Sequence, residues 1–238
     1  MLEESQLFGG RSAGEVIRIG DTVRRDIGPH SEFVHSLLKL LEEKHFEYAP
    51  KFLGTDEKGR EILSFIKGEV SHGKREWNDK QLLEITQIIK KFHDATEKSQ
   101  LAGNDEIVCH NDIAPWNIIL DKDIPVGIID FDGAASGKRV DDLAYFLWTF
   151  LELGSSIPVD LQAQKMKIVC DAYGSVNIKS LIDAIEKQQV KILKMREDLS
   201  INADSIEARE FSKERIKIIH SEMDWFKHNK KEIEKLLT

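Results

Sequence analysis

The spacing of apolar residues predicts that the first part of the chain combines short strands with one helix. Residues 15–19 and 22–25 are rich in β-forming residues and meet at Gly20, which predicts a β-hairpin. From residue 31 to residue 43, apolar side chains recur with helical spacing, so this segment is predicted to be an amphipathic helix. Residues 61–68 predict a further strand that ends at a glycine.

A second group of short apolar runs lies between residues 108 and 129. Val108 and Cys109 predict a buried strand that leads into a loop. Residues 118–120 and 126–129 predict two strands that are joined by a turn at residues 121–125. Pairing of these strands as a hairpin would bring the start of the first strand and the end of the second to the same place.

The remainder of the chain is predicted to be mainly helical. A long amphipathic helix follows a cap at Asn78 or Asp79, and another helix begins at Asp141, which is a natural cap. From about residue 160 to the end the pattern is helical and charged. Breaks in this helical part are predicted near three residues: Gly174, Asn202 and Asn229.

Composition and net charge limit the kinds of fold and binding partner that are expected. The 238 residues are 41% hydrophobic, which is enough for one domain or two small lobes. The net charge of −8 argues against nucleic acid or an anionic membrane surface as the main partner, and it is compatible with a cationic small molecule. Two cysteines do not make a disulfide framework, and no apolar run has the length of a signal peptide or membrane span. We therefore expect a cytoplasmic protein.

Three polar residues around the predicted hairpin form a candidate site for phosphoryl transfer. Asp112 follows the buried strand, Asn117 begins the next strand, and Asp130 ends its partner. Hairpin pairing places Asn117 and Asp130 together, where two oxygen ligands suit Mg²⁺, while the carboxylate of Asp112 would face a substrate hydroxyl. Taken singly, Asp and Asn in loops are most often turn formers and caps, so the prediction depends on all three occurring together.

The residues around this site resemble the catalytic and metal loops of the protein-kinase-like superfamily. Residues 110–112 (His-Asn-Asp) stand where protein kinases have His-Arg-Asp, and residues 130–132 (Asp-Phe-Asp) stand where they have Asp-Phe-Gly. No Ala-Pro-Glu follows, and residues 132–142 leave no room for a long activation segment. The pattern instead resembles the aminoglycoside phosphotransferase and choline kinase branch. It is also similar to bacterial phosphotransferase-like proteins, some of which carry a trifolitoxin-immunity label.

This resemblance implies an α+β fold with two lobes. The smaller lobe, with an antiparallel sheet, is expected at residues 1–68, and the larger helical lobe at residues 69–238. The resemblance also implies binding of ATP or GTP with Mg²⁺ and phosphorylation of a small-molecule hydroxyl. Asp112 is then the catalytic residue, and Asn117 and Asp130 are the metal ligands. His110 is expected to hold the loop by packing and hydrogen bonding.

The same resemblance assigns the nucleotide-binding residues. A loop at residues 9–14 would cover the phosphates through its backbone amides. Taken alone, its sequence favours a plain turn, and the phosphate assignment depends on its position in the family pattern. Arg25 is the candidate phosphate-binding cation, with Arg24 as the alternative. Glu32 is the candidate partner of that cation, but an acid in a first turn also stabilises a helix by itself. The other candidates are Gly10, Arg11 and Ser12 in the loop, and the Ser64 carbonyl and Ile66 amide for the adenine edge.

The acceptor pocket of this branch is built from C-terminal helices, in which several residues are candidates for binding an amine. These residues are acids that are otherwise expected on the solvated surface: Asp198, Asp204, Glu207, Glu222 and Asp224. Trp225 and Phe226 either line a pocket or pack in the core. The alternative function is that of a non-catalytic nucleotide-binding or toxin-immunity protein with the same fold. The intact set of Asp112, Asn117 and Asp130 favours the enzyme. The sparse glycine loop, and an Arg where protein kinases have a Lys, favour the alternative.

Overall fold

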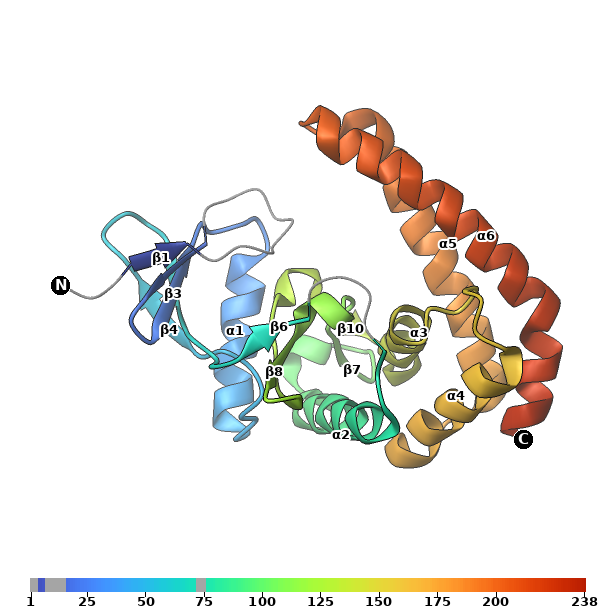
Figure 1. Ribbon diagram of the computed structural model, residues 1–238. Helices are drawn as coiled ribbons and strands as arrows, with labels where there is room; N and C mark the ends of the chain where they lie inside the picture. Colours follow the sequence, from blue (N-terminus) through green and yellow to red (C-terminus); the bar gives the residue numbers. More distant parts are fainter. Residues whose placement is uncertain (1–3, 7–15, 72–75) are drawn as a thin grey trace. The chain divides into compact units, whose positions relative to one another are not determined.

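The computed structural model describes residues 4–6, 16–71 and 76–238, and the chain divides into two compact units (Figure 1). The first unit comprises residues 1–139 and contains the strands, and the second comprises residues 140–238 and is helical. The expected boundary between two lobes after residue 68 lies inside the first unit, and it stays a prediction.

An antiparallel sheet of five strands begins the first unit, with the order β1-β2-β3-β5-β4. Strands β2 and β3 form the predicted hairpin around Gly20, whose φ of 59° is accessible to glycine without strain. The register between β3 and β5 places Val23 opposite Leu63 and Arg25 opposite Glu61. The strand bounds are Glu4–Gln6 for β1, Ile17–Ile19 for β2, Thr22–Arg25 for β3, Phe52–Thr55 for β4 and Glu61–Ser64 for β5.

Helix α1 (Ser31–Glu43) has the bounds predicted from its apolar spacing, and it packs on strand β4 and helix α2. The Gly28 amide, which precedes the helix, donates to the hydroxyl of Ser31 at 2.9 Å. Burial of each large aliphatic side chain on the inner face of α1 stabilises the fold by roughly 1.5–3 kcal/mol. The apolar residues buried there are Val34, Leu37, Leu38 and Leu41.

Helix α2 (Asp79–Thr96) is the predicted long helix, and Asn78 caps it. The side chains of Asn78 and Gln81 each accept a hydrogen bond from the other residue's backbone amide, which completes a capping box. His93 is buried near the end of the helix, as predicted for a packing role. Strand β7 (Ile107–Cys109) follows and pairs with β10 (Ala135–Gly137).

The hairpin of β8 and β9 places both predicted metal ligands at one end of the sheet. Its turn is shorter than the predicted 121–125, because only Lys122 and Asp123 lie outside the strands. Both have left-handed φ values of 47° and 70°, the geometry of a tight two-residue hairpin turn. Strand β6 pairs with β8, so the residues directly after Gly68 add a third strand to this hairpin. The bounds are Glu69–Val70 for β6, Ile118–Asp121 for β8 and Ile124–Ile128 for β9.

In the second unit, helices α5 and α6 pack along each other as a long hairpin, and α4 packs on α6 (Figure 1). The predicted breaks near Gly174 and Asn202 are confirmed. The break predicted at Asn229 is wrong. Asn229 lies within α6, where its Nδ2 donates to the Trp225 carbonyl one turn earlier at 2.8 Å. The bounds are Val159–Tyr173 for α4, Ile178–Asn202 for α5 and Ile206–Leu237 for α6.

Helix α3 (Arg139–Phe150) begins two residues before its predicted cap. Asp141 and Asp142 therefore lie in the first turn, where carboxylates interact favourably with the helix dipole. The earlier start is explained by Arg139, whose guanidinium donates to Asp94 at 2.8 Å and to Glu97 at 3.2 Å, both on α2. A structural role for the two acids is retained, although Asp141 is not the cap.

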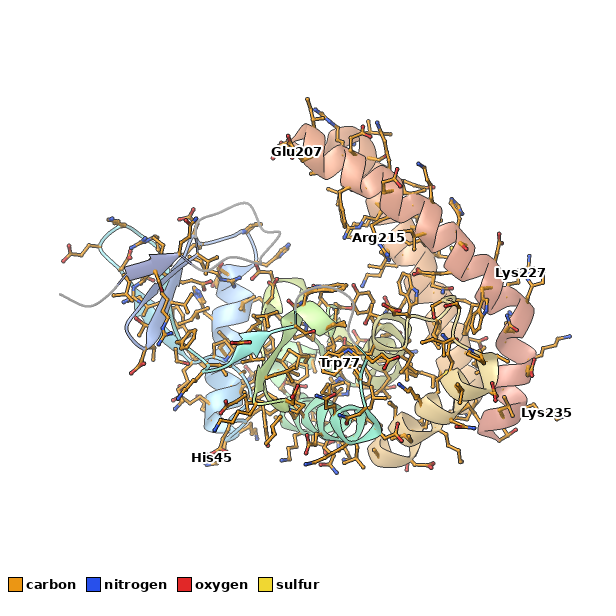
Figure 2. All side chains as sticks on the ribbon, in the orientation of Figure 1. His45, Trp77, Glu207, Arg215, Lys227 and Lys235 are labelled. Atoms are coloured by element: carbon orange, nitrogen blue, oxygen red, sulfur yellow. The ribbon has the colours of Figure 1, made fainter. Side chains whose placement is uncertain are left out.

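Helix α6 has a charged outer face and an apolar inner stripe. Glu207, Lys227 and Lys235 are exposed (Figure 2). Phe226 and Ile233 are fully buried. Ion pairs between exposed residues one turn apart on such a helix contribute under about 1 kcal/mol each. The apolar stripe therefore supplies most of the stability with which α6 packs.

Two further properties follow from burial and hydropathy. Among the residues that the structure describes, no helix is both long and apolar enough to cross a bilayer. Cys109 and Cys170 are both buried, and burial raises the pKa of the Cys170 thiol to about 11. Cys170 is therefore a neutral core thiol at physiological pH.

Candidate active site

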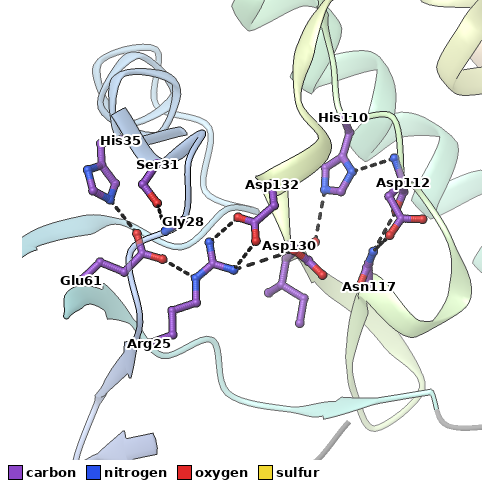
Figure 3. Close-up of polar contacts among 11 residues, drawn as sticks. Arg25, Gly28, Ser31, His35, Glu61, His110, Asp112, Asn117, Asp130 and Asp132 are labelled. Atoms are coloured by element: carbon purple, nitrogen blue, oxygen red, sulfur yellow. Dashed lines mark hydrogen bonds and ion pairs between the residues drawn. The ribbon is translucent and has the colours of Figure 1, made fainter. Parts of the chain in front are cut away.

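The loop after β7 carries Asp112, and His110 holds it in place (Figure 3). The buried His110 ring accepts a hydrogen bond at Nδ1 from the Asp112 amide at 3.2 Å. Its Nε2 donates to the Ile129 carbonyl at 3.1 Å. A ring nitrogen that accepts from a backbone N–H carries no proton, so these contacts select the tautomer protonated at Nε2. His110 therefore ties the Asp112 loop to the segment before Asp130, as predicted.

Asn117 is directed onto Asp112 by two hydrogen bonds. Its Nδ2 donates to the Asp112 carbonyl at 2.9 Å and to the Asp112 carboxylate at 2.8 Å. Because only 3% of Asn117 is exposed, this orientation is fixed by its surroundings. Both amide protons point to Asp112, so the amide oxygen is the atom that faces away and can bind a cation.

Asp130 lies beside Asn117 because the hairpin brings the two backbones together. The Ile129 amide donates to the Asn117 carbonyl at 3.0 Å, and Asp130 follows in a left-handed conformation with φ 68°. Asp tolerates this region better than most residues, and the turn directs its side chain out of the strand. Burial raises the pKa of Asp130, and the carboxylates of Asp132 and Asp112 raise it further, against the effect of Arg25. A cation bound at this carboxylate would offset both the burial of its charge and the repulsion from the other carboxylates.

The donor set fits Mg²⁺ that arrives with a nucleotide. Asn117 and Asp130 offer one amide oxygen and one carboxylate, and Mg²⁺ is commonly bound by one or two carboxylates together with substrate phosphates. Among the described residues, no group of three or more His, Cys, Asp and Glu could hold a metal ion by itself. The arrangement therefore suits a metal shared with phosphates better than a resident metal centre.

The guanidinium of Arg25 lies at the centre of a carboxylate network (Figure 3). Its Nε donates to Glu61, its direct partner across β3 and β5. Its Nη1 and Nη2 donate to the two carboxylate oxygens of Asp132 at 3.1 and 2.6 Å. Its Nη1 also lies 3.8 Å from Asp130 Oδ1. Burial by itself would lower the pKa of Arg25, but Asp132 and Glu61 outweigh it and raise the pKa, so the side chain stays charged.

Arg24, the alternative cation, belongs to the opposite face of the sheet. Its Nε lies 3.9 Å from the carboxylate of Asp56, which also binds Arg60. Strand alternation separates the two neighbouring arginines, so Arg25 and not Arg24 lies near Asp130. Glu32, the predicted partner of the cation, is exposed in the first turn of α1, and Glu61 takes that position instead.

The remaining predicted nucleotide contacts are only partly within the described chain. Gly10, Arg11 and Ser12 lie outside the described residues, so their assignment stays a prediction. Ser64 ends β5, and its hydroxyl accepts a hydrogen bond from a neighbouring backbone amide at 2.8 Å. Within the described chain, the Ile66 amide makes no hydrogen bond to a backbone carbonyl. The assignment of this amide to the adenine edge stays a prediction.

A pocket of about 540 Å³ borders the segment that contains Ile66. The guanidinium of Arg18 forms part of its wall and lies 3.8 Å from the centre of the Phe65 ring. Asp112, Asn117 and Asp130 are not part of its lining. The lining residues are Arg18, Phe65, Lys67, Gly68, Glu69, Val70, Ser71, Leu120, Asp121, Lys122 and Asp123.

Three residues of the network were not predicted as site residues. Asp132 has a visible signal, because it stands two positions after Asp130 in the motif. Glu61 and His35 have no such signal in the sequence, because their contacts depend on the pairing of distant strands and on the orientation of α1. His35 Nε2 lies 2.6 Å from the second carboxylate oxygen of Glu61.

The predicted acceptor residues of the second unit have different surroundings. Phe226 packs in the core, and Asp198, Asp204, Glu207 and Asp224 are exposed. Glu222 is partly buried and accepts a hydrogen bond from Trp148 Nε1 at 3.1 Å. Burial raises the pKa of Glu222, and Arg215 and Trp148 oppose this shift. Glu222 is therefore the one of these five acids with both burial and a defined partner.

Comparison with known proteins assigns the chain to a family. The model of the phosphotransferase enzyme family (APH) matches residues 32–174, which is more than half of the chain. The chain belongs to the phosphotransferase enzyme family. It is 34% identical over 193 residues to the trifolitoxin immunity protein of Rhizobium leguminosarum bv. trifolii. The match covers 70% of this chain and 72% of that protein.

Solved structures of kinases and phosphotransferases share the fold of this phosphotransferase-family chain. An ethanolamine kinase of Plasmodium vivax superposes with a TM-score of 0.70 at 14% identity, covering 93% of this chain and 83% of that chain. The spectinomycin phosphotransferase APH(9)-Ia, in complex with ADP and spectinomycin, gives 0.64 at 12% identity, with coverage of 93% and 92%. The gentamicin complex of APH(2")-IIa gives 0.59 at 14% identity, with 93% of each chain covered. The predicted α+β, protein-kinase-like fold is thereby confirmed.

Proposed function

We propose that this protein transfers the γ-phosphate of ATP or GTP to a hydroxyl group of a small, amine-bearing acceptor. The observation that carries the proposal is the convergence of Asp112, Asn117, Asp130 and Arg25 within the first unit. Complexes of structural neighbours with ADP and spectinomycin, and with GDP and kanamycin, support the nucleotide and the class of acceptor. The net charge of −8 also favours a cationic acceptor. The cytoplasm, where ATP and GTP are abundant, is the expected compartment.

In the proposed reaction, the acceptor oxygen attacks the γ-phosphorus while the bond from that phosphorus to the β,γ-bridging oxygen breaks. The carboxylate of Asp112 orients the acceptor hydroxyl and takes its proton, and the nucleoside diphosphate leaves. Asn117 and Asp130 would hold Mg²⁺, which neutralises charge on the phosphates when it is bound. Arg25 would bind the phosphates with Nη1 and Nη2, in competition with Asp132.

The decisive test is Asp112→Asn, which keeps the size of the side chain but removes the base. The variant should bind Mg²⁺ and ATP nearly as the wild type does, and its turnover should fall by on the order of 10²–10⁴, the range for a positioned general base. Because dissociative phosphoryl transfer demands little of its base, the lower end of this range is expected. Aminoglycosides, ethanolamine-like amines and sugars should be screened as acceptors, with slow ATP hydrolysis as the fallback assay.

A second candidate function is toxin immunity without catalysis, and the 34% identity to the trifolitoxin immunity protein favours it. The same variant separates the two candidates. If the wild type transfers phosphate to none of these acceptors and hydrolyses no ATP, while Asp112→Asn retains its biological effect, the enzyme proposal fails. Loss of that biological effect in a folded Asp112→Asn protein would instead favour catalysis.

A further inference from the structure

Helix α1 supplies a histidine, rather than an acid, to the network behind Arg25. His35 Nε2 donates to one carboxylate oxygen of Glu61 at 2.6 Å, and Arg25 Nε donates to the other (Figure 3). A carboxylate can only accept, so His35 Nε2 carries a proton whether the ring is neutral or charged. A continuous chain of hydrogen bonds thus runs from α1 through β5 to the guanidinium on β3.

The burial of Glu61 explains why two donors are needed. None of the Glu61 side chain is exposed, and a buried carboxylate is costly unless its oxygens are paired. Arg25 binds only one oxygen with its Nε, and His35 binds the other. The His35 ring is fixed in turn by stacking on Phe52, with centroids 3.7 Å apart and planes inclined by 18°. His35 therefore completes the pairing of Glu61.

The pairing of Glu61 determines how Arg25 is presented. With Nε bound to Glu61, the two terminal nitrogens point together at Asp132, whose side chain is 48% exposed. We propose that Glu61 and His35 are positioning residues, which hold the Arg25 guanidinium so that Nη1 and Nη2 can pass from Asp132 to the nucleotide phosphates. This inference rests on the proposed function, because it requires Arg25 to bind phosphate.

The test removes the donor of His35 without removing its ring. His35→Phe retains the stacking on Phe52, and His35→Gln restores an N–H donor without the ring. Calorimetry with Mg²⁺ should show ATP and ADP binding to His35→Phe about tenfold more weakly than to the wild type, as expected for a charge-assisted hydrogen bond. Adenosine affinity should stay unchanged, and His35→Gln should recover most of the lost ATP affinity. Glu61→Gln should lose at least as much ATP affinity as His35→Phe.

A matched control lies on the other face of the same sheet. Asp56→Asn removes a carboxylate that contacts Arg24 and Arg60, and it should leave the ratio of ATP to adenosine affinity unchanged. Equal weakening of ATP and adenosine in His35→Phe would overturn the inference, because it would reveal a purely structural role. Failure of His35→Gln to recover ATP affinity would also overturn it.

A second readout does not depend on nucleotide binding. In the unliganded protein, the Nε–H resonance of Arg25, identified by its loss in Arg25→Met, should exchange slowly with water. His35→Phe should shift that resonance and speed its exchange, and Asp56→Asn should do neither. An unchanged resonance in His35→Phe would overturn the positioning of Arg25. If the wild type binds no nucleotide, the proposed function fails, while this resonance still decides whether His35 positions Arg25.

Discussion

Arg24 and Arg25 are neighbours in the sequence, yet they belong to two different environments on the two faces of one sheet. On the Arg24 face, Asp56 accepts from the Arg60 amide at 3.0 Å and from the Arg60 guanidinium at 2.9 Å, which closes the turn between β4 and β5. On the Arg25 face, Glu61, Asp130 and Asp132 surround one guanidinium. Arg24 thus lies beside an ion pair that closes a turn, whereas Arg25 is itself the centre of a carboxylate network. The alternation of a strand separates these two roles.

The largest effect is expected when the Arg25 face loses Asp130, the predicted metal ligand. Asp130→Ala should abolish Mg²⁺-dependent ATP binding, because Mg²⁺ needs a charged oxygen ligand beside the phosphates. The fold should be retained, because the carboxylate is unfavourably placed near Asp132 and Asp112. Calorimetry with ATP and Mg²⁺ measures this effect, and thermal denaturation checks the fold. Affinity equal to that of the wild type would remove Asp130 from the site.

An intermediate effect should separate the two arginines directly. Arg25→Met should weaken ATP binding by roughly 10–100-fold, as expected when hydrogen bonds to a charged group are lost. The affinity for adenosine should stay unchanged. Arg24→Met serves as the matched control and should change neither affinity, since Arg24 lies on the other face. The comparison between the faces would fail if the two variants lost ATP affinity equally.

The smallest effect concerns stability on the Arg24 face. Desolvation would raise the pKa of Asp56, but hydrogen bonds from Arg60 and Lys58 outweigh it and lower the pKa below its usual 3.8. An acid with a lowered pKa stabilises the folded state above its unfolded pKa, and this contribution is lost as the pH falls through the folded pKa. Asp56→Asn should therefore lower the Tm at pH 7 by about 2 °C, the usual scale for a surface charge cluster.

Thermal scans at pH 7 and at pH 3 test the sign of this effect. The difference in Tm between wild type and Asp56→Asn should shrink at the lower pH, because the wild-type carboxyl then takes up a proton. A difference that stays the same at both pH values would show that Asp56 acts through packing and not through its charge. ATP affinity should be the same in both proteins at pH 7.

Elements defined by local spacing were predictable from the sequence. Helix α1, the hairpin of β2 and β3 and the cap at Asn78 all depend on residues within one or two turns of each other. One error is local and the other is not. The pattern predicts a helix break at Asn229, but its side chain bonds back to the preceding turn. The pattern also predicts Asp141 as a cap, but contacts of Arg139 with the distant helix α2 start α3 earlier.

The residues of the candidate site also divide into those that the sequence predicts and those that it does not. Asp112, Asn117 and Asp130 were found because a loop and a hairpin bring close neighbours together. Arg25 was identified through its motif position, and its place beside Asp130 agrees with that assignment. Glu61 and His35 were missed, because their contacts with each other and with Arg25 join β3, β5 and α1, which no local pattern reveals. Propensity alone could not show that a buried acid on β5 replaces Glu32.

The two halves of the network also differ in the length of chain that each must close. The His110 contact with Ile129 spans 19 residues, whereas the Arg25 contact with Asp132 spans 107. By the logarithmic dependence of closure entropy on loop length, the longer contact costs about 1.5 kcal/mol more to form. We therefore expect the half that carries Asp112, Asn117 and Asp130 to assemble early as a local unit while the chain folds. We expect the Arg25 contacts with Asp132 to form later, because they join residues that lie far apart in the sequence.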